Sequence, residues 1–67
     1  MTYNIEDCWI YDSEGKRVIF CHRLPNLLIV HAVLTHKIKN ADAAPYLPKI
    51  LLSKLNKIVI KLTLGDL

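Results

Sequence analysis

The sequence has no long apolar run, few cysteines and few glycines, and each shortage excludes a class of protein. No apolar run approaches the roughly 18–20 residues that a helix needs to cross a bilayer, so a transmembrane protein is not expected. Two cysteines in 67 residues are too few for a disulfide-rich scaffold. With only two glycines, Gly15 and Gly65, the chain cannot form the glycine-rich loops that bind dinucleotides or nucleotide phosphates.

Apolar residues, by contrast, are abundant. They make up 52 % of the sequence, and the mean hydropathy is +0.25, which excludes an intrinsically disordered chain. A chain of this size buries only about 60 % of the surface that it exposes when unfolded. We therefore predict one small domain over residues 1–67 whose apolar excess, in residues 27–34 and 50–64, is covered by a partner. Self-association into a homodimer is the commonest way to cover such a surface.

Charge is divided unevenly along the chain. Residues 1–15 contain four acidic residues and no Lys or Arg, whereas residues 16–67 contain nine Lys or Arg and two acidic residues, for a net charge of +3. This distribution leaves two interpretations open, a solvated surface or a basic patch that binds nucleic acid or anionic lipid. The acidic start lacks the pattern of a secretory signal, so we expect a cytoplasmic protein with reduced cysteines.

Two segments rich in β-branched and aromatic residues, 3–11 and 17–24, predict a β-hairpin. Between them, Asp12 and Gly15 suit a type I turn closed by a glycine bulge. The glycine favours a three-residue loop, which places four apolar side chains on one face: Cys8, Ile10, Val18 and Phe20. A four-residue loop is the alternative, and it pairs Cys8 with Cys21, Trp9 with Phe20 and Glu6 with Arg23.

The rest of the chain predicts two helices and a final strand beside the hairpin. Asn26 is a suitable N-cap for a first helix over residues 27–39, with a buried strand over 27–34 as the alternative. After a connector over residues 40–45, a second helix extends to about Asn56. Residues 57–64 alternate in polarity, which indicates a strand, although a helical stripe that continues to Leu62 is also possible. The predicted fold is a small α+β domain with the order β-β-α-α-β.

No pattern in the chain indicates an enzyme, a metal or another cofactor. Cys8, Cys21, His22, His31 and His36 do not have the paired spacing of a zinc site. Motifs for nucleophilic catalysis are missing, and 67 residues leave little volume for a substrate pocket. A disulfide between Cys8 and Cys21 requires the four-residue register, so two reduced cysteines in the core are the expectation.

We expect instead a small interaction module, a homodimeric regulator or inhibitor that binds another protein. Aromatic side chains commonly dominate the binding energy of such interfaces. The predicted interface residues are Trp9, Tyr11, Leu28 and Ile29.

The alternative function is a basic regulator that binds nucleic acid. Four cations would contact the phosphates: Arg17, Lys54, Lys57 and Lys61. The aromatic residues that would stack on bases lie in the acidic half of the chain, which weakens this hypothesis. A third hypothesis is a cationic amphipathic helix over residues 46–62 on a membrane surface, which requires residues 57–62 to be helical.

Overall fold

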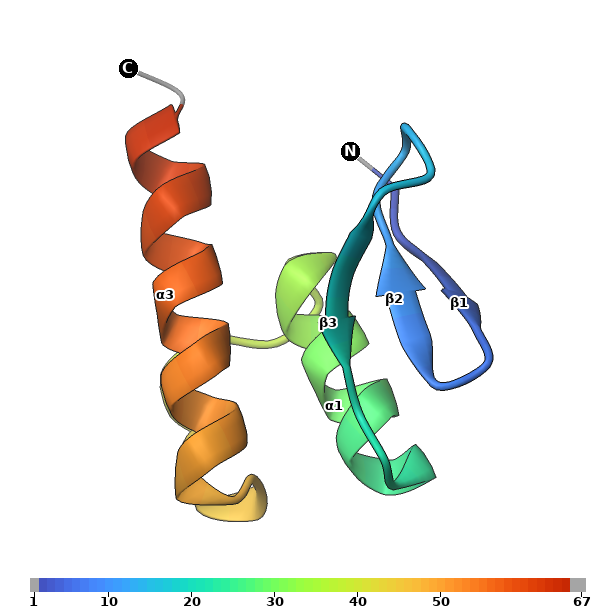
Figure 1. The fold of residues 1–67 in the computed structure, drawn as a ribbon. Helices are drawn as coiled ribbons and strands as arrows, with labels where there is room; N and C mark the ends of the chain where they lie inside the picture. Colours follow the sequence, from blue (N-terminus) through green and yellow to red (C-terminus); the bar gives the residue numbers. More distant parts are fainter. Residues whose placement is uncertain (1, 66–67) are drawn as a thin grey trace.

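Three short strands come before the helices in the chain (Figure 1). The computed structural model describes residues 2–65, and Met1, Asp66 and Leu67 lie outside the described residues. The elements are, in order, β1 (Asn4–Glu6), β2 (Trp9–Tyr11), β3 (Arg17–Phe20), α1 (Leu24–Leu34), α2 (Asn40–Ala43), the 3-10 helix η1 (Ala44–Tyr46) and α3 (Lys49–Gly65). The predicted α+β class is confirmed. The predicted order β-β-α-α-β is wrong, because the third strand of the sheet precedes the helices.

A two-residue turn divides the first predicted strand into β1 and β2. Asp7 and Cys8 both have positive φ, 52° and 67°, and Glu6 pairs with Trp9 across the turn. Positive φ at both central residues defines a type I′ turn, whose twist matches that of two paired strands. The usual residues of this turn are Asn-Gly and Asp-Gly. The sequence does not predict this turn, because Cys8 occupies the position where glycine is usual.

The turn between β2 and β3 is the one that the sequence predicts. The Gly15 N–H donates a hydrogen bond of 3.0 Å to the Asp12 carbonyl oxygen, and Gly15 has a φ of 81°. The Oδ1 atom of Asp12 accepts two further hydrogen bonds of 2.9 Å, from the backbone N–H groups of Glu14 and Lys16. A type I turn closed by a glycine bulge is therefore confirmed, and the Asp12 carboxylate stabilises it.

The pairing of β2 with β3 combines the two predicted registers. Tyr11 pairs with Arg17, as the three-residue loop requires, but a bulge then shifts the strands so that Trp9 pairs with Phe20. A shift of one residue moves the side chains beyond the bulge to the other face of the sheet. The prediction that Phe20 and Cys8 lie on the core face is therefore wrong, because Phe20 is 45 % exposed and Cys8 is also exposed.

Helix α1 starts and ends earlier than the predicted helix over residues 27–39. Pro25 lies in the first turn, where its fixed φ suits a helix, and Arg23 rather than Asn26 is the N-cap. At the other end His36 has a φ of 62°, and the N–H groups of His36 and Lys37 donate to carbonyl oxygens of the last turn. This Schellman ending usually contains glycine, so nothing in the sequence indicates that the helix stops here.

The predicted strand over residues 57–64 is wrong, because these residues belong to helix α3. The second predicted helix therefore continues well beyond Asn56. Its inward side buries Leu55 completely, and Leu51 and Ile58 pack partly against the same core. The alternating polarity of residues 57–64 is also compatible with this helical stripe, so the period of the sequence alone does not distinguish a strand from a helix here. The predicted connector over residues 40–45 forms the short helices α2 and η1.

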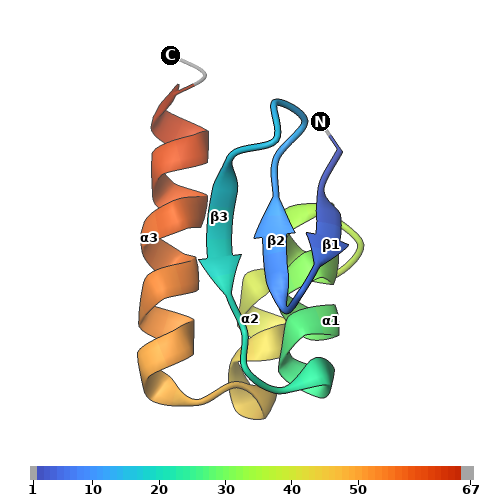
Figure 2. The ribbon, with the colours of Figure 1, turned by 45° about the vertical axis from the view of Figure 1, so that its right-hand side comes forward.

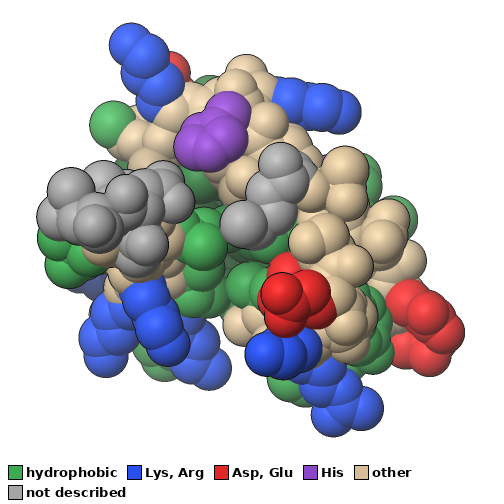
Figure 3. Space-filling view, turned by 90° about the horizontal axis from the view of Figure 1, so that it is seen from above, with side chains coloured by type: hydrophobic (Ala, Val, Ile, Leu, Met, Phe, Trp, Pro, Cys, Tyr) green, Lys and Arg blue, Asp and Glu red, His purple; other side chains and the backbone are tan. Residues whose placement is uncertain are grey.

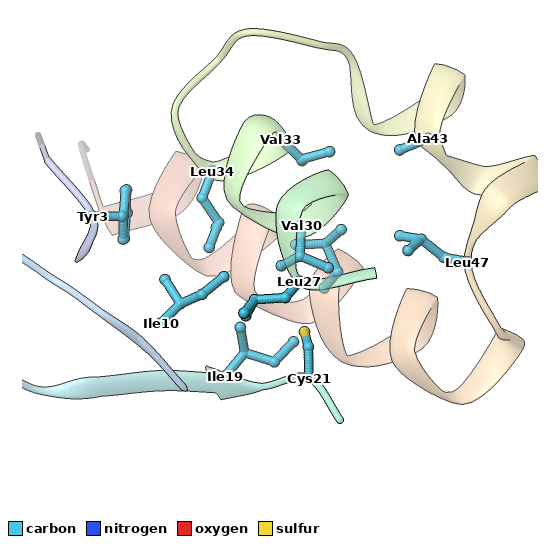
Figure 4. Close-up of a cluster of buried hydrophobic side chains, with 11 residues drawn as sticks. Tyr3, Ile10, Ile19, Cys21, Leu27, Val30, Val33, Leu34, Ala43 and Leu47 are labelled. Carbon is cyan, nitrogen blue, oxygen red and sulfur yellow. The ribbon is translucent and has the colours of Figure 1, made fainter. Parts of the chain in front are cut away.

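The core lies between the sheet and the helices. Helix α1 covers one face of the sheet, and α3 runs beside β3 in the opposite direction (Figure 2). Side chains from the sheet side point toward α1 (Figure 4): Ile10, Ile19 and Cys21 face Leu27 and Val30. The other face of the sheet, called here the outer face, is not covered by a helix of the described chain.

Candidate functional site

Two aromatic side chains lie in contact on the outer face of the sheet. Trp9 and Phe20 are directly opposed in β2 and β3, and their ring centroids are 5.3 Å apart at an interplanar angle of 59°. They alternate with Ile10 and Ile19, which are buried on the inner face. The register that removes Phe20 from the core therefore places its exposed ring against the half-buried ring of Trp9.

The guanidinium group of Arg17 packs over one ring of this aromatic pair. The guanidinium carbon of Arg17 lies 4.9 Å from the centroid of the Trp9 ring. At an exposed site such a cation–π contact contributes roughly 0.5–1 kcal/mol and leaves guanidinium N–H groups able to donate to a ligand. Tyr11 pairs with Arg17 and is half-buried, so it borders the same surface.

A pocket of about 550 Å³ connects the aromatic pair with α3. Phe20 forms part of its lining from the sheet, Arg23 from the turn before α1, and Ile50 and Lys54 from the first turns of α3. None of the described residues that line this pocket is acidic. Cationic groups and exposed apolar groups therefore lie together at the junction of sheet and helix.

Three lysines form a stripe along α3. Lys54, Lys57 and Lys61 are all exposed, and their spacing places them within about 60° of one another around the helix. The distance along β3 from Phe20 to Arg17 is about 10 Å, since a strand rises about 3.3 Å per residue. A helix needs about seven residues for the same distance, which is the separation of Lys54 and Lys61. Because β3 and α3 run in opposite directions and Phe20 lies near Lys54, Arg17 is level with Lys61. Figure 3 shows Lys and Arg side chains on the same side of α3 and of the hairpin.

We call this surface the basic–aromatic face and define it as Trp9, Arg17 and Phe20 of the sheet with Lys54, Lys57 and Lys61 of α3. Among residues 2–65, the acidic residues that border it belong to the sheet side. Glu6 pairs with Trp9 and belongs to the edge strand β1, and Glu14 forms an ion pair of 3.4 Å with Lys16 in the β2–β3 turn. The surface therefore has an acidic side at β1 and a basic side at α3.

The four predicted interface residues do not form one surface. Trp9 and Tyr11 lie on the outer face of the sheet and are half-buried. Leu28 is 53 % exposed on α1, which covers the opposite face of the sheet. Ile29 is half-buried and packs against the core.

The four predicted phosphate-binding residues are all exposed, and the geometry of β3 and α3 brings them to one side of the molecule. Phe20 and Arg23, which were not among the predicted site residues, extend this group. The pairing of Trp9 with Phe20 in the four-residue register was the signal for Phe20. No sequence signal places Arg23 beside Lys54, because the two belong to elements that meet only in the fold.

A second pocket, of about 490 Å³, lies between the end of α1 and the second half of α3. Apolar residues such as Val33 and Val59 line it together with His36 and Lys37. It contains none of the predicted site residues, and nothing in its lining indicates a particular chemistry.

The histidines and cysteines do not gather at one point. His31 lies in α1 with its Nε2 atom 2.8 Å from the carbonyl oxygen of Tyr3, so it connects α1 to the start of the sheet. Within residues 2–65 no group of three or more His, Cys, Asp or Glu side chains is placed to hold a metal ion. Burial raises the pKa of the Cys21 thiol, and the nearby Cys8 raises it further.

None of the helices within residues 2–65 combines the length and the hydropathy that crossing a bilayer requires. Residues 57–62 are helical, so the condition for an amphipathic membrane-surface helix is met. The apolar stripe of α3 that contains Leu55 faces the core, and the exposed side carries lysines together with Ile50, Ile60 and Leu64. No protein-family model, curated protein or solved structure matches the chain.

Proposed function

We propose that this protein is a small non-catalytic module that binds single-stranded nucleic acid through the basic–aromatic face. The observation that carries the proposal is the contact between half-buried Trp9 and exposed Phe20, with Arg17 on the Trp9 ring and the lysine stripe of α3 beside them. Proteins that bind single strands combine aromatic platforms for the bases with a positively charged path for the backbone. A cytoplasmic location is part of the proposal.

The geometry supports a path for the strand between the sheet and α3. Bases would stack on Trp9 and Phe20, and phosphates would run along Lys54, Lys57 and Lys61. Glu6 on the far side of Trp9 repels phosphates, so the backbone is expected to follow α3 rather than β1. Single strands are favoured over duplexes because only unpaired bases expose their faces for stacking.

The direct test is a titration with a fluorescein-labelled oligothymidylate, read by anisotropy, at several salt concentrations. Trp9 is the only tryptophan, so quenching of its fluorescence reports contact at the face itself. With about three phosphates neutralised, the slope of log K against log salt is expected to be about −2. Trp9→Ala is expected to weaken binding by about 1–3 kcal/mol, which is the usual loss for one stacked base.

The matched control removes the same charge elsewhere. Lys61→Ala is expected to make the salt slope shallower by about 0.7, whereas Lys37→Ala, in the exposed segment after α1, is expected to leave the slope unchanged. Equal effects of the two variants would show that net charge alone attracts the oligonucleotide. Absence of binding at low salt would refute the proposal.

A second candidate function retains the predicted homodimer that binds another protein. Leu24 and Leu28 are 62 % and 53 % exposed and lie one turn apart on α1. No Asp, Glu, Lys or Arg occurs between Arg23 and Lys37 in the sequence, so two copies of this helix would meet without like-charge repulsion. Light scattering at high concentration is expected to give twice the monomer mass, and Leu28→Lys is expected to restore the monomer. A monomeric wild-type protein would exclude this candidate.

A further inference from the structure

The two cysteines are neighbours at one end of the β2–β3 pair, where Cys8 lies in the turn directly before β2 and Cys21 directly follows β3. The Cys21 N–H donates a hydrogen bond of 3.0 Å to the Cys8 carbonyl oxygen, and this contact extends by one residue the register that pairs Trp9 with Phe20. Directly opposed residues of antiparallel strands have Cα atoms roughly 4.5–5.5 Å apart. That spacing falls within the range of roughly 4.4–6.8 Å that a disulfide bond spans.

The two thiols differ in their access to solvent. Cys8 is exposed at the turn between β1 and β2, whereas Cys21 is only 2 % exposed. Figure 4 shows the Cys21 side chain pointing from the sheet side toward Leu27 of α1. An oxidant from solution therefore reaches Cys8 first, and burial keeps the Cys21 thiol protonated.

The backbone at Cys8 supplies an independent observation. Cys8 has a φ of 67°, in the left-handed region, at the turn position where glycine is the unstrained residue. Unusual backbone conformations at residues other than glycine cost free energy and tend to mark functional positions. Here the strained residue carries an exposed thiol, and its backbone is hydrogen-bonded to that of the second cysteine.

We propose that Cys8 and Cys21 form a reversible intramolecular disulfide, with a small disulfide such as oxidised glutathione as the oxidant. In the first step the Cys8 thiolate attacks one glutathione sulfur, which forms a mixed disulfide and releases a glutathione thiolate. In the second step Cys21 loses its proton to solvent and its sulfur attacks the Cys8 sulfur of the mixed disulfide, which releases the second glutathione thiolate. The two cysteines are oxidised and one oxidised glutathione is reduced to two thiols.

This bond would lock the strands beside the aromatic pair. Trp9 directly follows Cys8 in the chain, and Phe20 directly precedes Cys21, so the disulfide fixes the register that holds the two rings together. The proposal does not depend on nucleic-acid binding. It makes the basic–aromatic face sensitive to the thiol–disulfide balance of its surroundings.

The test treats the full chain with oxidised glutathione at pH 8 and measures the intact mass before and after addition of a reductant. The wild-type protein is expected to lose about two mass units as a monomer, to yield a peptide that joins residues 8 and 21, and to recover its mass on reduction. Cys21→Ala is expected to stop at a mixed disulfide on Cys8. Cys8→Ser is expected to stay unmodified, because its remaining thiol is buried.

Two results would overturn the proposal. The first is a wild-type protein that accumulates only the mixed disulfide or a cysteine-linked dimer, with no loss of two mass units. The second is a wild-type protein that stays reduced while free cysteine in the same tube is oxidised. If Cys21→Ala does not fold, as judged by circular dichroism, the peptide map of the wild-type protein and the Cys8→Ser control still decide the outcome.

Discussion

Residues with positive φ determine both turns of the sheet, and Cys8 is an unfavourable residue for this conformation. Cys8 has a φ of 67°, which costs a residue with a Cβ atom roughly 1 kcal/mol relative to glycine. Cys8→Gly is therefore expected to raise the free energy of unfolding by about that amount under reducing conditions. Urea denaturation should show a higher midpoint with an unchanged slope. Cys8→Ala is the control, because it keeps the strain and is expected to give no gain.

In the β2–β3 turn, replacing the glycine at the position with positive φ is expected to destabilise the protein. Gly15 has a φ of 81°, and a Cβ atom added there would meet no atom within 4 Å. Gly15→Ala therefore tests the backbone conformation without a steric clash, and it is expected to lower the free energy of unfolding by about 1 kcal/mol. The loss should appear in the urea midpoint, with Ser13→Ala in the same exposed turn as a control for surface substitution. An unchanged midpoint for Gly15→Ala would contradict the assignment of this turn.

At the scale of elements, α3 makes the sharpest prediction because the sequence is compatible with a strand there. Leu55 is fully buried and Ile60 is 57 % exposed. Leu55→Ala is expected to cost about 2–5 kcal/mol through the lost burial and the cavity that it leaves. Ile60→Ala is expected to leave stability unchanged or slightly raised, since alanine is the better helix former. A clear loss at Ile60 would instead favour a strand, where β-branched residues are preferred.

The errors in the predicted elements have two physical causes. An alternating pattern with lysines every four residues satisfies both a strand and a helix, so residues 57–64 could not be assigned by period alone. Two further errors occur where a residue other than glycine adopts positive φ, as Cys8 does in the first turn and His36 does at the end of α1. The turn at Asp12 and Gly15 was predictable because its residues are the usual ones for its geometry.

At the scale of the whole molecule, the candidate site depends on packing that no spacing in the sequence encodes. Arg17 and Lys61 were identified as basic residues, but only the opposite directions of β3 and α3 bring them to the same level. The separation into an acidic start and a basic remainder was predictable from composition. The fold places Trp9 of the acidic start beside Phe20 and the cations of the basic remainder. That placement removes the objection that sequence analysis raised against nucleic-acid binding.

The stability of the whole molecule is expected to fall at alkaline pH through two buried groups. Burial raises the pKa of the Cys21 thiol above its ordinary value of 9.0, and the nearby Cys8 adds to the rise. Burial, followed by the charge of Asp12, raises the pKa of Tyr3 above 10.0. For both groups the unfolded chain loses its proton first as the pH rises, so folding is increasingly opposed above the ordinary pKa.

The free energy of unfolding is measured with urea in the presence of a reductant. The contribution of Cys21 ionisation to it should be constant below about pH 8 and should lower it above pH 9. One group contributes at most about 1.4 kcal/mol per pH unit to this slope. Cys21→Ala is expected to remove the part of the decrease in the free energy of unfolding between pH 9 and pH 10 that Cys21 causes. Cys8→Ser, at an exposed position, should retain most of that decrease. Equal pH profiles for the wild type and Cys21→Ala would show that Cys21 is not buried in the folded protein.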